Sequence, residues 1–155
     1  MIVMAEDTLH DQAGMERAFR TYFQTLREES PDTLNAMLNA DFLACDRERM
    51  TVTLRAETKP WMTNPGNILH GGVTAAYLDL AMGLLCRYFT GGRMTPTIHV
   101  DVTYLRTITV GDALCFRASM VKAGGTICFT EASLWGEDRP DRPLASATGA
   151  YHVTR

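Results

Sequence analysis

The chain lacks an excess of charge of either sign. Its 155 residues include 15 lysines and arginines and 18 aspartates and glutamates, which gives a formal net charge of −3. Binding to a nucleic-acid backbone usually needs a basic stripe, and no run of like charge is present here. We therefore expect no nucleic acid among its partners.

Long apolar runs are also missing. No stretch approaches the roughly 20 residues of a membrane-spanning helix, and residues 1–7 lack the basic start and apolar core of a secretion signal. The four cysteines are far apart in the sequence and form no Cys-x-x-Cys pair, so we expect reduced thiols rather than a disulfide framework. They are Cys45, Cys86, Cys115 and Cys128. These features predict a cytoplasmic protein with no membrane span.

The length and the hydrophobic content of 46% are sufficient for one domain with a core, and too small for two ordinary domains. Apolar side chains recur at nearly helical spacing over residues 8–29, which predicts an amphipathic helix. Ser30-Pro31 resembles an N-cap followed by proline and predicts a shorter helix ending near Asn39. We expect residues 1–40 to form an N-terminal helical extension and residues 41–155 to form the main domain.

The middle of the chain predicts a hairpin, an irregular loop and a buried helix. Residues 42–45 and 50–56 have strand character and flank a charged turn, whereas residues 58–69 are rich in proline, glycine and asparagine. Residues 71–89 are apolar on most sides at helical spacing, so this helix must be buried. Gly91-Gly92 is typical of a helix C-terminus.

The last third of the chain predicts four strands. Residues 97–104 alternate with period two, so Ile98, Val100, Val102 and Tyr104 are expected on one covered face. Residues 114–122, 126–135 and 144–153 are the next strands, joined by a tight turn at Gly124-Gly125 and by a proline-rich loop. Four consecutive strands suggest an antiparallel meander. The whole order indicates an α+β fold in which an antiparallel sheet wraps a central helix.

The candidate site lies where the loop meets the buried helix. His70-Gly71-Gly72 stands at the predicted helix start, where the first backbone N–H groups have no partner within the helix and can bind developing negative charge. Asp79 follows about two turns later and is the helix's only internal charge before its last turns. An uncompensated carboxylate in an apolar helix is costly, so its presence favours a functional use.

Structural interpretations of the same residues stay open. Asn64 stands in a good turn sequence, and His70 could serve only as a helix cap. Asp79 could be a buried carboxylate bonded to backbone or to Tyr77 of another subunit, and the two glycines could serve helix packing. None of the histidines His10, His99 and His152 has a companion at metal-ligand spacing, so we expect no metal.

Taken together, these residues resemble the hotdog-fold acyl-CoA thioesterases, specifically the phenylacetyl-CoA and 4-hydroxybenzoyl-CoA thioesterase type. The residues that carry the resemblance are Asn64, His70-Gly71-Gly72, Asp79 and the segments 97–105 and 106–112. The resemblance implies a hotdog fold over residues 41–155 and a hydrolase of acyl-CoA or aryl-acyl-CoA thioesters. It also implies a homodimer or a dimer of dimers, that is, a homotetramer, and coenzyme A only as part of the substrate.

The resemblance further implies a role for each matched residue. The backbone N–H of Gly71 would polarise the thioester carbonyl, which His70 and Asn64 would help to place. Asp79 of the second subunit would act as nucleophile or as general base, and the resemblance does not decide between the two. Thr97 would support the attacking water, although strict alternation places it on the polar face, so the strand end must bend or open toward the site.

Substrate contacts are expected in three places. Gly72 lies at the helix start, while Ala75, Ala76, Met82 and Gly83 lie within a helical turn or so of Asp79 and would leave room for the acyl group. By resemblance, the turn with Lys122, Gly124, Gly125 and Thr126 would contact the nucleotide end of coenzyme A, and Arg93 and Arg106 its phosphates. A solvated hairpin is the plain alternative for that turn.

Two other functions fit the same fold. A hotdog hydratase or dehydratase would act on an enoyl or 3-hydroxyacyl thioester, but it needs a paired histidine and carboxylate, and no Asp-x-x-x-x-His segment is present. A non-catalytic acyl-CoA binding module would hold the ligand without releasing thiol. The placed carboxylate of Asp79 argues against this second alternative.

Overall fold

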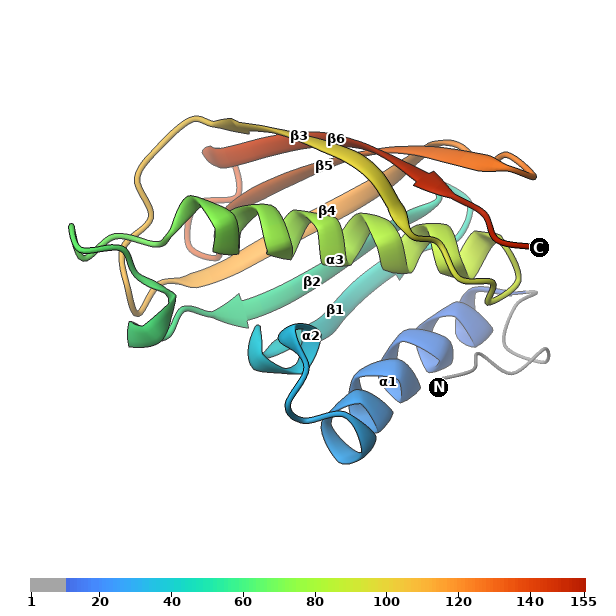
Figure 1. The fold of residues 1–155 in the computed structure, drawn as a ribbon, viewed down its shortest axis with the longest axis horizontal. Coiled ribbons are helices and arrows are strands. Elements are labelled where there is room, and N and C mark those ends of the chain that lie inside the picture. The colour runs from blue at the N-terminus through green and yellow to red at the C-terminus, as the bar shows by residue number, and fades with distance from the viewer. Residues whose placement is uncertain (1–10) are drawn as a thin grey trace.

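A long helix lies in the curve of an antiparallel sheet in the computed structural model, which describes residues 11–155 (Figure 1). The sheet has six strands in the order β1-β2-β4-β5-β6-β3. The helices are α1 (Gln12–Glu29), α2 (Leu34–Met37) and α3 (Gly71–Phe89), with a short 3₁₀ turn, η2, at Pro60–Met62. The strands are β1 (Ala40–Asp46), β2 (Thr51–Glu57), β3 (Thr97–Tyr104), β4 (Ala113–Lys122), β5 (Ile127–Gly136) and β6 (Pro143–His152).

The central helix α3 has the bounds that its sequence predicts. His70 is its N-cap, and most of its side chains are buried, including Tyr77, Leu78 and Leu85 at 0% exposure. Gly91 and Gly92 follow it with φ values of 73° and 80°, a left-handed conformation that glycine adopts without steric cost. The prediction of a buried helix that ends at this glycine pair is confirmed.

The strand order corrects the predicted meander. β4, β5 and β6 do pair in sequence, but β3 pairs with β6 at the edge of the sheet, and β2 pairs with β4. Consecutive strands are neighbours only about two-thirds of the time. The connection over residues 105–112 is longer than a tight hairpin turn, so it can carry the chain from the edge across to β4. The prediction of hairpin pairing between 97–104 and 114–122 is therefore wrong.

The edge strand β3 is less covered than its alternation predicts. Val100 and Val102 are half-buried against the core, whereas Ile98 and Tyr104 are 52% and 55% exposed. A strand at a sheet edge has neighbours on one side only, so its apolar side chains at both ends stay open to solvent. The prediction of one covered face thus holds only for the middle of the strand.

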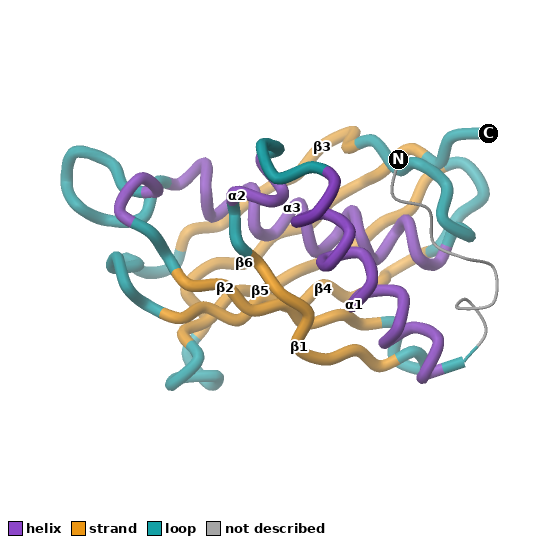
Figure 2. Tube along the Cα trace, turned by 90° about the horizontal axis from the view of Figure 1, so that it is seen from below, coloured by secondary structure: helices purple, strands orange, loops and turns teal. Residues whose placement is uncertain are grey.

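The N-terminal helix α1 packs beside β1 on the helix side of the sheet (Figure 2). Met15, Phe19 and Phe23 are buried, and the Phe19 ring stacks on Phe42 of β1 at a centroid distance of 5.9 Å. Asp11 caps the helix by accepting a hydrogen bond from the backbone N–H of Gly14 at 2.6 Å. The predicted helix is confirmed over residues 12–29, and residues 8–10 lie outside the described residues.

The second helix is shorter than expected. α2 starts at Leu34 with Thr33 as its N-cap, and Ser30, predicted to cap it, instead ends α1 by donating its backbone N–H to the carbonyl of Leu26. Proline at position 31 starts a turn rather than a helix, because residues 31–33 do not continue into helical backbone. The division between an extension and a main domain at residue 40 stays a prediction.

Candidate active site

The Asp79 carboxylate is held by two hydroxyl groups. The hydroxyls of Thr97 on β3 and Tyr151 on β6 each donate a hydrogen bond to Asp79 Oδ1, both at 2.9 Å. Within the described residues no donor contacts Oδ2. One carboxylate oxygen is therefore fixed in orientation, and the other is available to a ligand.

Thr97 reaches Asp79 because β3 is irregular at its start. The register between β3 and β6 shifts between Thr97 and His99, so strict alternation does not apply to the first residue of the strand. An extra residue in one strand bends it and turns a side chain toward a different face. The condition that the strand end must bend for Thr97 to serve the site is thus met, and the contact with Asp79 is direct.

Tyr151 is a site residue that the sequence analysis missed. It is fully buried and pairs across the sheet with Cys128 and Thr97. Burial, and then the negative charge and hydrogen bond of Asp79, raise the pKa of its hydroxyl, so it remains a proton donor. The only signal in the sequence was a tyrosine on the inward face of the last strand; its contact with the helix depends on long-range pairing.

Within the described residues, the Asp79 carboxylate is not bonded to the backbone amides or to Tyr77, which the structural alternative expected. Tyr77 is fully buried, and its hydroxyl donates to the backbone carbonyl of Leu38 at 3.1 Å, so it does not reach outward to a second copy. The groups that bind the Asp79 side chain are two side-chain hydroxyls rather than backbone amides.

The start of α3 presents a backbone N–H at Gly71. The Nδ1 atom of His70 accepts a hydrogen bond from the N–H of Gly72 at 2.9 Å, and the carbonyl of His70 accepts from Val73 and Thr74. Within the described residues no acceptor is found for the N–H of Gly71. His70 thus caps the helix, as one interpretation predicted. Its side chain binds the N–H of Gly72 and leaves the N–H of Gly71 available for an anion.

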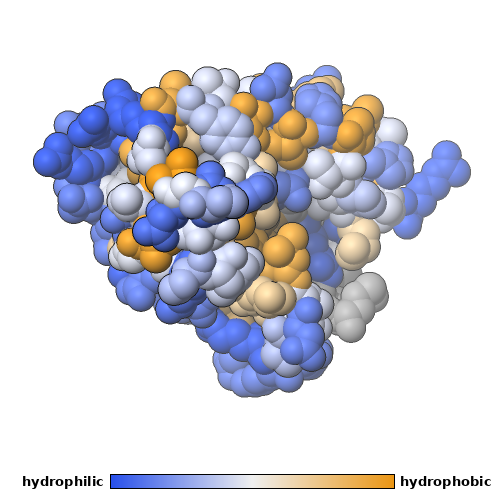
Figure 3. All heavy atoms as spheres, turned by 60° about the vertical axis from the view of Figure 1, so that its left-hand side comes forward, coloured by the Kyte–Doolittle hydropathy of each residue, from blue (hydrophilic) through white to orange (hydrophobic). Residues whose placement is uncertain are grey.

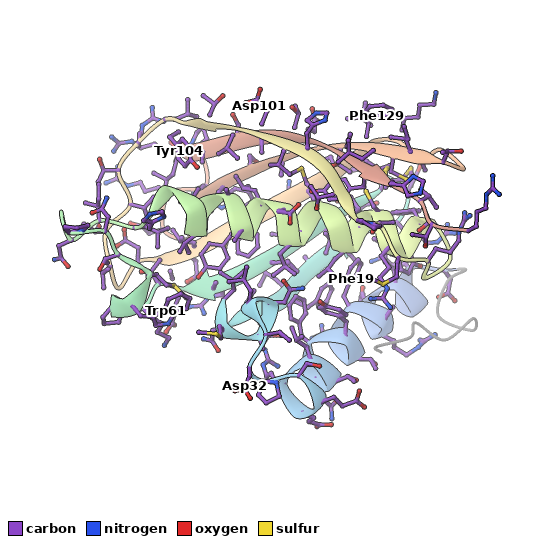
Figure 4. The ribbon with its side chains drawn as sticks, in the orientation of Figure 1. Phe19, Asp32, Trp61, Asp101, Tyr104 and Phe129 are labelled. Atoms are coloured by element: carbon purple, nitrogen blue, oxygen red, sulfur yellow. The ribbon has the colours of Figure 1, made fainter. Side chains whose placement is uncertain are left out.

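Tyr104 covers the same helix start and was also missed. Its hydroxyl donates to the carbonyl of Gly71 at 2.8 Å, and it lies at the end of β3 beside α3 (Figure 4). A Cβ atom added at Gly71 would lie 3.3 Å from the hydroxyl oxygen of Tyr104. Glycine at this position therefore permits the close approach of the tyrosine ring.

Asn64 combines a turn role with a position on the site. Its Oδ1 accepts from the N–H of Gly66 at 2.9 Å, and its carbonyl accepts from Asn67, which has a left-handed φ of 59°. Asn64 also lines a hollow of about 410 Å³ together with Gly71, Tyr104 and Arg106. Asn64 therefore has the predicted role in a turn, and its side-chain amide nitrogen remains able to donate to a ligand.

Within one chain the two halves of the predicted site are separate. Gly71 lines the hollow of about 410 Å³, whereas Asp79 lines another of about 230 Å³. Asp79 follows Gly71 by eight positions in the helix, which corresponds to about 12 Å along the axis. Hydrophobic residues reach the surface as separate patches on the side of the molecule turned forward in Figure 3.

The remaining predicted contacts are scattered. Met82 is fully buried in the core, and Ala75 and Ala76 are half-buried, whereas Gly83 lines the hollow beside Asp79. Gly72 is exposed beside its His70 cap.

The two regions predicted to contact coenzyme A lie apart. Arg106 donates to the carbonyl of Pro143, at one end of the sheet, and the turn with Lys122, Gly124, Gly125 and Thr126 lies at the opposite end. Arg93 donates to the carbonyl of Thr90. One chain alone therefore does not bring these contacts together.

Comparisons with known proteins place this chain beside thioesterases. A model of the Thioesterase superfamily matches residues 66–141. The acyl-CoA thioester hydrolase YciA of Salmonella typhimurium is 29% identical over 93 residues, which cover 60% of this chain and 70% of that protein. Zebra fish thioesterase superfamily member 2 has a TM-score of 0.76 at 22% identity, over 88% of this chain and 98% of that one. The chain has the hotdog fold.

A further solved structure, smu.793 of Streptococcus mutans bound to acetyl CoA, has a TM-score of 0.67 at 22% identity, over 75% of this chain and 89% of that one. The predicted hotdog fold is confirmed, and the matches to the Thioesterase superfamily model and to YciA support the resemblance to acyl-CoA thioesterases. No helix among residues 11–155 is long and apolar enough to cross a membrane. The same residues contain no group of three or more histidine, cysteine, aspartate or glutamate side chains arranged to hold a metal.

Proposed function

We propose that this protein hydrolyses the thioester of an acyl-CoA or aryl-acyl-CoA to a free acid and coenzyme A, in the manner of the phenylacetyl-CoA and 4-hydroxybenzoyl-CoA type. The observation that carries the proposal is the Asp79 carboxylate. Two hydroxyls bind one of its oxygens, and the residue lines a hollow that can take an acyl group. The relatives named above, one of them an acyl-CoA thioester hydrolase and another bound to acetyl CoA, support the same substrate class.

The reaction needs one electrophile-stabilising donor and one base or nucleophile. In the proposal, the N–H of Gly71 donates to the carbonyl oxygen of the thioester, on which negative charge develops. If Asp79 is a general base, it takes a proton from water as the water oxygen bonds to the carbonyl carbon; the C–S bond then breaks and the thiolate takes up the proton. If Asp79 is the nucleophile, it forms an acyl anhydride, releases the thiolate, and water then hydrolyses the anhydride.

The two groups act together in this proposal across a dimer of identical chains. The separation of about 12 Å along α3 supports an arrangement in which one chain supplies Gly71 and the other supplies Asp79. The edge strand β3 supports it too, because its outer backbone groups have no strand partner within the described chain and its apolar residues Ile98 and Tyr104 are exposed. A dimer of dimers is compatible with the same contact.

The other predicted residues take supporting roles. Asn64 and His70 help to place the carbonyl, and Thr97 orients Asp79 and the attacking water. Gly72 permits close approach of the substrate at the helix start, and Ala75 and Met82 border the acyl group. The coenzyme A moiety is contacted by Arg106 and by the turn with Lys122, Gly124, Gly125 and Thr126. The turn of each chain contacts the coenzyme A bound at the site of the other chain.

The direct test measures thiol release from a panel of acyl-CoAs by the wild type, Asp79→Asn and Asp101→Asn. Asp101 is a matched control because it is an exposed aspartate on the same strand as Thr97, on the outer side of the sheet (Figure 4). Losing a base or nucleophile is expected to lower kcat by about 10²–10⁴-fold in Asp79→Asn, with little change in Asp101→Asn. Equal rates in all three proteins would remove Asp79 from the mechanism.

The binding-module alternative is separated by measuring affinity alongside turnover. A wild type that binds acyl-CoA without releasing thiol would be a binding module rather than a hydrolase. Under the proposal, Asp79→Asn retains acyl-CoA binding in a calorimetric titration while its turnover is lost, since the substitution keeps the size and shape of the side chain.

A further inference from the structure

The hollow beside Asp79 continues away from the carboxylate along one face of α3. Asp79, Gly83 and Arg87 line it at four-residue spacing, which places them on one side of the helix. This stripe is about 12 Å long, because each residue adds about 1.5 Å. With a volume of about 230 Å³, the hollow lies below the roughly 300–1,000 Å³ of sites for drug-sized ligands. It suits a short acyl group rather than a long chain.

The middle of this hollow is apolar and has a glycine in its floor. Leu80 and Leu84 are each 5% exposed and line it on either side of Gly83. A Cβ atom at Gly83 would lie 3.4 Å from Cε1 of Tyr151, so glycine here lets the Tyr151 ring lie close against α3 at the wall of the hollow. The hydroxyl of Thr95 donates to the Gly83 carbonyl at 3.1 Å and holds the wall formed by the segment after the helix.

The hollow is polar at its Arg87 end, where the N-terminal helices contribute two side chains and the charge of Arg87 acts on the Tyr22 hydroxyl. Tyr22 of α1 and Asn35 of α2 line it, and the amide nitrogen of Asn35 donates to the hydroxyl oxygen of Tyr22 at 3.1 Å. Tyr22 is 4% exposed, and within the described residues its own O–H proton has no acceptor and the Asn35 Oδ1 has no donor. Both groups can therefore bond to an atom placed in the hollow, where the Arg87 side chain adds positive charge.

We propose that the N-terminal helices complete the acyl-binding site, and that Tyr22 and Asn35 select acyl groups that carry an oxygen at the end remote from the thioester. This inference rests on the proposed hydrolysis of acyl-CoA. A hydroxyl or carboxylate oxygen at that end accepts a hydrogen bond from the Tyr22 hydroxyl, and a hydroxyl also donates one to Asn35 Oδ1. An acyl group that ends in a methyl leaves the buried Tyr22 hydroxyl with no acceptor for its proton, and sites built to bond a polar group reject such analogues.

The test compares acyl-CoAs of equal chain length with three ends: methyl, hydroxyl and carboxylate. The wild type is expected to hydrolyse at least one oxygen-ended substrate with a kcat/KM about ten times or more that for the methyl-ended one. Tyr22→Phe removes only the hydroxyl and is expected to lower that preference, the ratio of the two kcat/KM values, by about tenfold. The hydroxyl and carboxylate arms show which oxygen the site prefers.

Two further variants keep the result interpretable. Tyr88→Phe is the matched control, since Tyr88 is a buried tyrosine that does not line the hollow, and it should leave the preference unchanged. Asn35→Ala removes the second polar group from another element and should lower the preference in the same direction as Tyr22→Phe. Thermal unfolding of each variant checks that the fold is intact.

The outcomes separate this inference from the proposed function. An active wild type whose preference is the same in Tyr22→Phe and Asn35→Ala would overturn the selection by the N-terminal helices and leave the hydrolase intact. A wild type that prefers the methyl-ended substrate would also overturn it. If the wild type releases no thiol from any of the three substrates, the proposed function fails and this inference fails with it.

Discussion

The proposed role of the Gly71 amide can be tested by removing that single N–H. Proline has no backbone N–H and is favoured at the first position of a helix, where Gly71 stands. His70 before it has φ −63° and ψ 134°, which is the extended conformation that a residue preceding proline adopts. Gly71→Pro should therefore delete one hydrogen-bond donor and leave α3 in place.

The expected loss of activity is that of one oxyanion donor. Removing one donor from an oxyanion site lowers kcat by about 10²–10³-fold, or about 2.7–4 kcal/mol. Gly71→Ala is the control, since its Cβ atom would approach the Tyr104 hydroxyl to 3.3 Å, a crowding that proline shares, while the N–H is retained. Steady-state thiol release is the assay. Equal kcat values in the proline and alanine variants would refute the oxyanion role of this amide.

The same variant tests whether each site draws on two chains. Gly71→Pro and Asp79→Asn are mixed after unfolding and refolding together. If the sites are shared across the dimer, half of the dimers are mixed and each contains one intact site, so about a quarter of the wild-type activity returns. If one chain supplies both groups, the mixture stays as inactive as its components.

Three smaller effects follow from individual contacts. Thr97→Ala removes a hydroxyl from Asp79 Oδ1 and should lower kcat by about tenfold in the thiol-release assay, whereas Thr103→Ala on the same strand should have no effect. Burial raises the pKa of Tyr77 to about 12, above the 10.0 of an exposed tyrosine. The free energy of unfolding should therefore fall as pH rises from 10 toward 12, by up to about 2.7 kcal/mol, and Tyr77→Phe should make the fall shallower in urea titrations. Phe19→Ala should lower the free energy of unfolding by about 3–5 kcal/mol in the same titrations, since Phe19 is fully buried.

The central helix could be predicted closely because its signals are local. The apolar pattern, the glycine pair at its start and the glycine pair after its end all lie within or next to residues 71–89, and α3 has those bounds. The start of the second helix could not be predicted as well, since Ser30-Pro31 fits a helix N-terminus and a turn equally. The backbone N–H of Ser30 donates to the carbonyl of Leu26, so Ser30 ends α1 and does not begin the next helix.

The strand order depends on contacts that the sequence does not carry locally. Alternation identifies strands but does not say which strand each one pairs with, and the eight residues between β3 and β4 allow either a hairpin or a crossing. Tyr151 and Tyr104 were missed for this reason. Each reaches the site only because β3 lies beside β6 at the edge of the sheet, over α3.

The bonding of Asp79 favours a functional carboxylate over a structural one. A carboxylate kept for stability alone in a largely buried helix would be expected to have donors on both oxygens, because each unpaired acceptor carries a desolvation penalty. Here Thr97 and Tyr151 both donate to Oδ1, and burial together with the negative charge keeps the Tyr151 proton in place. The two hydroxyls therefore fix the direction of Oδ2 without occupying it, as a base or nucleophile requires, and the hollow beside it gives an acyl group a place to lie.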